Sequence, residues 1–163
     1  AKPELGGQAA ETCGRAAKCR LDAGDAPGAL VLLRRARELS PGDLRFRVAL
    51  GGALEAAGDD DGALAEYRAV VAAEPESPMS SNRIDAIYQR RNDPAARVGE
   101  WRRAAGAHPD AAWPLLHLGL ALEAAGDLGA AETAYRGALS RNAAVDADSA
   151  VFRRAKQRER GAP

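Results

Sequence analysis

The sequence feature that most constrains the fold is an internal repeat. The stretch ALEAAGD occurs at residues 53–59 and again at residues 121–127, so the two copies begin 68 residues apart. A period in the range of about 20–50 residues is typical of arrays of small units, none of which can bury its apolar face alone. Half of the separation, 34 residues, divides the chain without insertion or deletion into blocks at residues 10–43, 44–77, 78–111 and 112–145.

Turn-forming residues recur at fixed places in these blocks. The first three blocks end near Pro41, Pro75 and Pro109. A further pair of turn residues stands near the middle of each block: Gly24-Asp25, Gly58-Asp59, Asn92-Asp93 and Gly126-Asp127. Gly and Asn tolerate the left-handed conformation that ends a helix, and the following Asp can cap the next helix. Each block is therefore predicted to be a helix, a tight turn and a second helix.

The second helix of each block carries a repeated apolar face, with one exception. Five, nine and twelve residues after the mid-block Gly or Asn come the sets Ala29, Leu33, Ala36; Ala63, Tyr67, Val70; Arg97, Trp101, Ala104; and Ala131, Tyr135, Ala138. Offsets of four and three residues lie on one side of a helix. These residues are predicted to pack between neighbouring helices.

With a unit of this length and pattern, residues 10–145 resemble the tetratricopeptide repeat family. Block four carries the resemblance best, through Leu118-Gly119, Leu122, Gly126, Ala131, Tyr135 and Ala138, and block two through Leu50-Gly51, Leu54, Gly58, Ala63, Tyr67 and Pro75. Block three departs from it, with Asp85 where the family has a small residue and Arg97 where it has Ala. The resemblance implies an all-α fold, a right-handed helical-repeat solenoid of antiparallel helix pairs.

The two ends of the chain lie outside the repeats. Residues 1–9, with Pro3 and Gly6-Gly7, are predicted to be a lead-in. Residues 146–163 are predicted to form a capping helix and tail, because Asp148-Ser149 can cap a helix over residues 150–160. Its apolar face comprises Val151, Phe152 and Ala155, and its basic surface comprises Arg153, Arg154, Lys156 and Arg158. Contact of this basic surface with a nucleic acid or an acidic partner is the alternative to a solvated cap.

The resemblance also implies a partner-binding groove lined by the first helix of each repeat. The inward-facing positions of the family fall on Glu11, Gly14, Lys18, Leu21 and Asp22 in block one, on Arg45, Val48, Gly52, Glu55 and Ala56 in block two, on Met79, Asn82, Ala86, Gln89 and Arg90 in block three, and on Trp113, Leu116, Leu120, Glu123 and Ala124 in block four. Our candidates for contact with a partner are Lys18, Arg45, Val48, Met79, Asn82, Arg83, Arg90, Trp113, Leu116 and Leu120.

Two of these positions bear on the kind of partner. Trp is a frequent interface anchor, and Trp113 would form an apolar strip with Leu116 and Leu120; packing of Trp113 on a neighbouring helix is the alternative. Some family members clamp a terminal carboxylate with Lys and Asn at the positions that are here Gly14 and Lys18, so this chain lacks that pattern.

The sequence shows no pattern for catalysis or metal binding. His108 and His117 have no Cys, Ser or Asp partner at a recognisable spacing. The run at residues 59–62 begins like a calcium loop, but its twelfth position is Val70 instead of a bidentate Glu. Cys13 and Cys19 would lie about 9 Å apart along one helix, too far for a disulfide. We therefore expect no catalytic residue, no metal and no cofactor.

Composition narrows the class of partner. The formal net charge is zero, which argues against a nucleic acid partner, and no apolar run of about 18 residues predicts a membrane span. Most of the 23 basic residues are Arg, which together with the abundant Ala and Gly suggests a bacterial source. The chain begins with Ala, so an N-terminal targeting segment could have been removed, and both cytoplasm and periplasm stay open.

The predicted function is therefore that of a non-catalytic protein–protein interaction module, a scaffold or assembly factor that binds a peptide or protein partner in the groove. One alternative is an accessory domain excised from a larger enzyme such as a transferase, hydrolase or kinase. Another, a nucleic-acid-binding helical repeat, fits the neutral charge poorly. Block two carries a net charge of −4 and block three of +2, which leaves open self-association through the solenoid ends.

Overall fold

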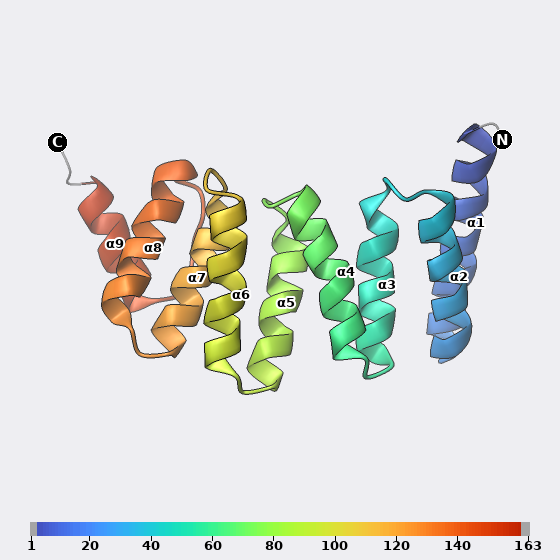
Figure 1. The fold of residues 1–163 in the computed structure, drawn as a ribbon, viewed down its shortest axis with the longest axis horizontal. Coiled ribbons are helices and arrows are strands. Elements are labelled where there is room, and N and C mark those ends of the chain that lie inside the picture. Colours follow the sequence, from blue (N-terminus) through green and yellow to red (C-terminus); the bar gives the residue numbers. More distant parts are fainter. Residues whose placement is uncertain (1–2, 161–163) are drawn as a thin grey trace. The chain divides into compact units, whose positions relative to one another are not determined.

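The computed structural model describes residues 3–160, and within them every regular element is an α-helix. Figure 1 follows these nine helices of the described chain from α1 to α9. Their bounds are α1 Pro3–Asp22, α2 Ala26–Leu39, α3 Leu44–Ala56, α4 Asp60–Ala73, α5 Pro78–Arg90, α6 Pro94–Ala107, α7 Ala112–Ala124, α8 Leu128–Arg141 and α9 Ala150–Arg160.

The first helix begins inside the segment that the sequence predicts as a lead-in. It starts at Pro3, so residues 3–9 are helical, while residues 1–2 lie outside the described range. A proline suits the first turn of a helix because its missing N–H would have no partner there. The early turns also lie against the end of α2, since a Cβ at Gly6 would come 3.3 Å from the carbonyl oxygen of Leu39. The helix thus runs through both adjacent glycines and packs closely on α2 at Gly6.

The helices group into two compact units, Ala1–Val70 and Val71–Pro163. In the first unit, α1 packs on α2 and α2 packs on α3. The buried carboxylate of Glu66 on α4 pairs with Arg37 on α2 and, at 3.0 Å, with Arg47 on α3. In the second unit, α7 packs on both α6 and α8, and α8 packs on α9.

The mid-block turns have the predicted geometry. The backbone φ angle is positive at Gly24 (76°), Gly58 (80°), Asn92 (51°) and Gly126 (86°). In each turn the following Asp accepts a hydrogen bond from a backbone N–H of the next helix: Asp25 from Gly28 at 2.9 Å, Asp59 from Gly62 at 2.9 Å, Asp93 from Ala96 at 2.9 Å and Asp127 from Ala130 at 3.1 Å. The prediction of a left-handed stop followed by an Asp cap is confirmed at all four places, and Asp59 is a helix cap.

Within each unit, one tyrosine ring lies directly on a glycine of the preceding helix. A Cβ at Gly51 would come 2.6 Å from Cε1 of Tyr67, and a Cβ at Gly119 would come 2.4 Å from Cδ1 of Tyr135. Real Cβ atoms do not approach a ring this closely, and both rings are fully buried. Glycine at these two positions is therefore what lets α3 approach α4 and α7 approach α8.

This close approach predicts that Gly119→Ala lowers the free energy of unfolding by about 1–3 kcal/mol, because the Tyr135 ring must shift within a packed core. Urea unfolding followed by far-UV circular dichroism measures the change. Gly129→Ala is the matched control, because a Cβ at Gly129 on α8 meets nothing within 4 Å. Equal midpoints for the two variants would contradict the packing described here.

The last helix closes the core of the second unit. Val151, Phe152 and Ala155 are buried as predicted, and the Phe152 ring contacts Tyr135 edge-on with ring centroids 5.2 Å apart. Ser149 caps the helix: its Oγ accepts a hydrogen bond from the Phe152 N–H at 3.0 Å and donates one to Glu123 Oε2 at 2.6 Å. The same Glu123 oxygen accepts a hydrogen bond from the Tyr135 hydroxyl at 2.7 Å, so one carboxylate joins α7, α8 and the start of α9.

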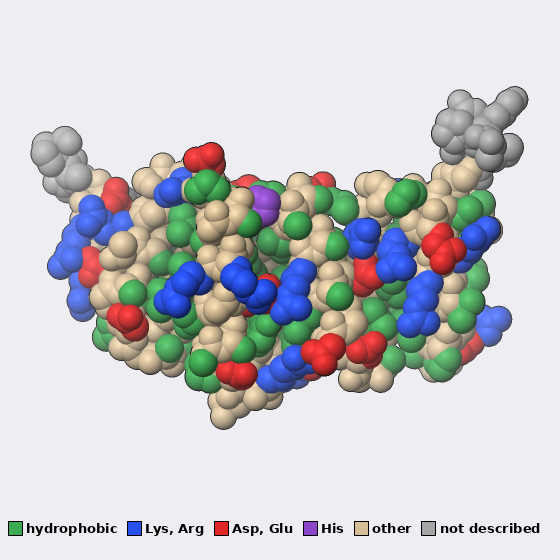
Figure 2. Space-filling view, in the orientation of Figure 1, with side chains coloured by type: hydrophobic (Ala, Val, Ile, Leu, Met, Phe, Trp, Pro, Cys, Tyr) green, Lys and Arg blue, Asp and Glu red, His purple; other side chains and the backbone are tan. Residues whose placement is uncertain are grey.

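Basic side chains gather over α9 on the face shown in Figure 2, with acidic side chains among them. Arg153 pairs with Asp148 at 3.1 Å, and Lys156 with Asp146 at 3.4 Å. Arg158 pairs with Glu132 on α8. These intramolecular pairs favour a solvated cap over a free basic surface.

Candidate partner-binding groove

A surface slot lies between α1 and α3 in the first unit. It has a volume of about 420 Å³, within the range of about 300–1,000 Å³ typical of ligand pockets. Its lining residues are Glu11, Gly14, Arg15, Lys18 and Leu21 from α1, Leu33 from α2, and Arg45, Phe46, Ala49, Gly52 and Ala53 from α3.

Small residues create this slot. Gly14 on α1 faces the Phe46 ring, and a Cβ at Gly14 would come 2.9 Å from Phe46 Cε1. On α3, Ala49 is exposed and Gly52 is half-buried, so neither fills the space between the helices. The deeper part is apolar because Leu33 and Phe46 are buried there. The result is an apolar recess between two helices whose nearest side chains are short.

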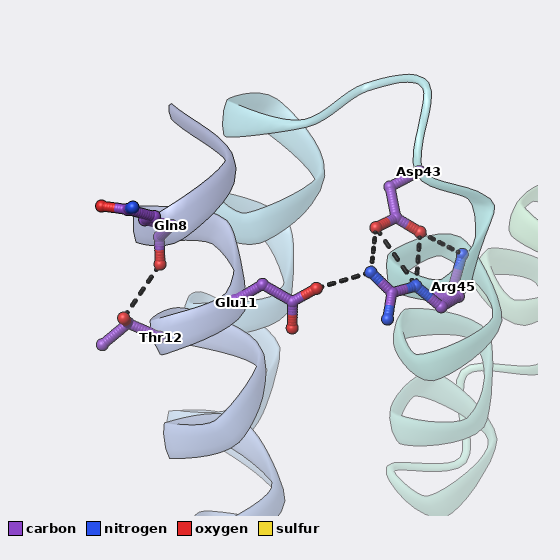
Figure 3. A network of polar contacts seen from close by, with 5 residues as sticks. All are labelled: Gln8, Glu11, Thr12, Asp43 and Arg45. Carbon is purple, nitrogen blue, oxygen red and sulfur yellow. Dashed lines mark hydrogen bonds and ion pairs between the residues drawn. The ribbon is translucent and has the colours of Figure 1, made fainter. Parts of the chain in front are cut away.

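An ion pair crosses from α1 to α3 beside the slot. Arg45 Nη2 lies 2.5 Å from Glu11 Oε1 and 2.6 Å from Asp43 Oδ2, and Arg45 Nε lies 3.0 Å from Asp43 Oδ1 (Figure 3). The hydrogen bonds from Arg45 hold the pKa of Asp43 below its ordinary value. Four of the lining residues, Glu11, Arg15, Arg45 and Phe46, also line a second, more polar cavity of about 770 Å³ that reaches Gln8 and Ser40. The positive charge of Arg45 beside the slot is therefore already neutralised.

Two further cations stand on the α1 side of the slot. Arg15 and Lys18 are three residues apart, so they are neighbours on the surface of α1. Lys18 pairs with Asp22 at 3.0 Å, and the two side chains are 77% and 64% exposed. Arg15 is exposed and forms no ion pair with any residue that the structure describes. This side of the slot can therefore accept a negative charge.

The structure places the sequence candidates of the first unit as follows. Lys18 and Arg45 line the slot, whereas Val48 is half-buried and is not among its lining residues. Sequence reasoning did not select Arg15, Phe46 or Ala49, which also line it. The small residues were the signal that could have indicated the slot, because Gly14 and Gly52 both stand at expected groove positions.

The remaining candidates belong to the second unit. Met79 is 61% exposed, and the three other candidates on α5, Asn82, Arg83 and Arg90, are exposed as well. On α7, Trp113 and Leu120 are half-buried against the core, but Leu116 is only 2% exposed. The expected strip of Trp113, Leu116 and Leu120 is therefore not one accessible surface, because core side chains cover Leu116.

The two unusual residues of block three contact each other in the core. Arg97 Nε donates a hydrogen bond to Asp85 Oδ1 at 2.6 Å, Arg97 Nη2 contacts Asp85 Oδ2, and Trp101 Nε1 donates to Oδ1 at 2.9 Å. Burial of Asp85 opposes its ionisation, but His117 and the Arg97 guanidinium outweigh that effect and hold the pKa of Asp85 below its ordinary value. Each departure from the family pattern thus compensates for the other.

His117, for which no partner is recognisable in the sequence, completes this cluster. Its ring stacks on Trp101 with centroids 4.5 Å apart, and the Trp113 ring lies tilted against the His117 ring with centroids 5.9 Å apart. Its Nδ1 is 3.7 Å from Asp85 Oδ2, too far for a hydrogen bond, and neither ring nitrogen has a hydrogen-bond partner among the described residues. Trp113 therefore touches the cluster from its half-buried position.

Two observations apply to the described residues as a whole. They contain no group of three or more His, Cys, Asp or Glu side chains placed to hold a metal ion. None of the helices between residues 3 and 160 is both long enough and apolar enough to cross a lipid bilayer.

Comparison with known families identifies the repeat. Residues 20–81, which include the turns at Gly24 and Gly58, match the model of the family described as "Tetratricopeptide repeat". This stretch contains tetratricopeptide repeat sequence. No curated protein sequence matches the chain.

Solved structures of tetratricopeptide repeat proteins show the same fold over most of the chain. MamA from Desulfovibrio magneticus has a TM-score of 0.57 at 22% identity, over 84% of this chain and 77% of that one. A tetratricopeptide repeat protein from Parabacteroides merdae has a TM-score of 0.58 at 18% identity, over 91% and 58%. PilF from Pseudomonas aeruginosa has a TM-score of 0.56 at 18% identity, over 94% and 70%. The predicted fold class, an all-α helical-repeat solenoid, is confirmed, and this fold is typical of protein–protein interaction modules.

Proposed function

We propose that this tetratricopeptide repeat chain is a non-catalytic interaction module that holds a segment of a partner protein in the slot between α1 and α3. The observation that carries the proposal is the coincidence of two independent features. The slot is an open apolar recess, and six of its lining residues, Glu11, Gly14, Lys18, Leu21, Arg45 and Gly52, stand at positions that the family uses to face a ligand.

The exposed candidates of the second unit are part of the same proposal as a separate contact surface. These are Met79, Asn82, Arg83 and Arg90 on α5, and the accessible parts of Trp113 and Leu120 on α7. We leave Leu116 out because it is buried. Within each unit, the apolar groups supply contact area and the charged groups restrict which partners fit.

Filling the slot should abolish capture of a partner. In a crosslinked pull-down from source lysate quantified by mass spectrometry, a protein enriched by the wild-type chain should be recovered at least about tenfold less by Ala49→Phe, because the new ring occupies the recess. Ala65→Phe is the matched control, since Ala65 is an exposed alanine on α4 of the same unit and does not line the slot.

The other outcomes are informative. Equal recovery by the wild-type chain and Ala49→Phe would place the site elsewhere. If Trp113→Ala then lost the partner, the site would be the surface of the second unit. If the wild-type chain enriched no protein, the proposed function would be wrong.

A further inference from the structure

The slot is shaped for one bulky apolar side chain. Its floor consists of Leu33 and of Phe46, whose ring packs on Gly14, and its side on α3 is open because Ala49 and Gly52 project little or no side chain into it. A recess with an apolar floor and short walls gains most when a single large side chain displaces its water. The partner segment must therefore carry an aromatic or large aliphatic anchor.

The charged residues that line the slot differ in how strongly they are already paired. Arg45 already contacts two carboxylates, at 2.5 Å and 2.6 Å, so an incoming acid gains little there and is repelled by Glu11. Arg15 has no ion pair among the described residues, and the pair of Lys18 with Asp22 is highly exposed. Exposed pairs of this kind contribute little to stability, so Lys18 can exchange its partner readily. Arg15 and Lys18 on α1 are therefore the cations with which an acidic group of the partner would pair.

We propose that the slot selects an acidic peptide segment in which one bulky apolar side chain enters between α1 and α3 while an adjacent carboxylate pairs with Arg15 and Lys18. This inference rests on the function proposed above and adds the chemistry of the partner. It differs from recognition of a terminal carboxylate, because the acidic group can belong to a side chain within the segment.

The first test uses the full chain and a defined peptide. The probe is an acetylated and amidated eight-residue peptide with one phenylalanine between two glutamates in a glycine–serine background. Titration should produce saturable ¹H–¹⁵N shifts at the amides of Gly14, Ala49 and Gly52, which line the slot. A peptide with serine in place of phenylalanine should bind at least about tenfold more weakly. A peptide with glutamines in place of glutamates should bind about three- to fivefold more weakly.

Variants of the chain provide the matched controls. Arg15→Glu should weaken binding of the glutamate peptide about three- to tenfold at low salt, whereas Arg34→Glu makes the same charge change on α2 outside the slot and should leave binding within about twofold. Ala49→Phe should abolish the shifts, and Ala65→Phe should not. Dispersed amide spectra establish that each variant is folded, and Arg15→Glu tests the inference even if Ala49→Phe does not fold.

Three results would overturn the inference: no shift at slot amides with millimolar peptide, equal binding of the glutamate and glutamine peptides, or equal weakening by Arg15→Glu and Arg34→Glu. These results are separable from failure of the proposed function. If Ala49→Phe loses a captured protein while the acidic peptide does not bind, the slot is the site and only the partner chemistry is wrong.

Discussion

Replacing Arg97 with alanine should lower the free energy of unfolding by about 3–5 kcal/mol, the range found when one partner of a buried ion pair is removed. The Arg97 and Asp85 side chains are each only 8% exposed, and Trp101 and His117 lie against the carboxylate. Loss of the guanidinium leaves Asp85 with hydrogen bonds only from Trp101 and, at 3.5 Å, from Gln89, and with no guanidinium to balance its charge. Urea unfolding followed by tryptophan fluorescence measures the change.

A double variant supplies the control for this prediction. Asp85→Ala with Arg97→Ala places small residues at both positions, as the family pattern has them, and removes the buried charge together with its partner. Its free energy of unfolding should lie above that of Arg97→Ala alone, despite the larger cavity. Coupling between the two substitutions should exceed about 1 kcal/mol; additivity within about 0.5 kcal/mol would show that the pair does not act as a unit.

The pH dependence of the same comparison gives a second measurement. The pKa of folded Asp85 lies below its ordinary value of 3.8, so its ionised form stabilises the fold above that pH. The contribution is lost as the pH falls through the folded pKa. On acidification below about pH 4, the free energy of unfolding of the wild-type chain should therefore fall relative to that of the double variant. A difference that does not change with pH would mean that Asp85 is not ionised in the core.

The turns could be predicted from the sequence because their physics is local. A tight helix–helix turn needs a left-handed residue, such as Gly24 or Asn92, followed by an Asp that caps the next helix. Because this pair recurs every 34 residues, each occurrence strengthens the prediction of the others. Contacts between residues far apart in the sequence were harder to predict. Glu76, for example, accepts a hydrogen bond from the backbone N–H of Ala112 at 2.5 Å and so caps α7 from a loop 36 positions earlier.

The buried cluster shows where sequence reasoning stopped short. Asp85 and Arg97 were each recognised as a departure from the family pattern, and each was treated alone. Their opposite charges were the signal that could have joined them, because an acid and a base at two positions that normally pack together satisfy one another. The role of His117 gave no such signal, since its contacts with Trp101 and Trp113 depend on how three helices pack.

The slot was partly visible in the sequence. The family positions indicated Lys18 and Arg45, but the positions say nothing of how deep a groove is. The depth of the slot depends on small side chains, such as that of Ala49, and on the orientation of the Phe46 ring against Gly14. For the same reason Leu116 was selected as a contact residue, although neighbouring helices bury it.

Replacing Phe152 with alanine should lower the free energy of unfolding of the second unit by about 3–5 kcal/mol, because the ring is fully buried and packs edge-on against Tyr135. Thermal unfolding measures the loss, and Arg154→Ala is the control, since Arg154 is an exposed residue of the same helix and should change the value by less than about 0.5 kcal/mol.

The measured loss for Phe152→Ala has an upper limit set by how α9 is attached. If the helix undocks by itself, the loss cannot exceed the free energy that holds it on α8, and amides of α9 alone should lose protection from hydrogen exchange. If the hydrogen bonds from Ser149 and Tyr135 to Glu123 keep α9 coupled to α7 and α8, protection should fall across all three helices together. Unchanged melting and exchange would contradict the assignment of α9 to the core, whereas a joint loss would make the capping helix a part of the folding unit.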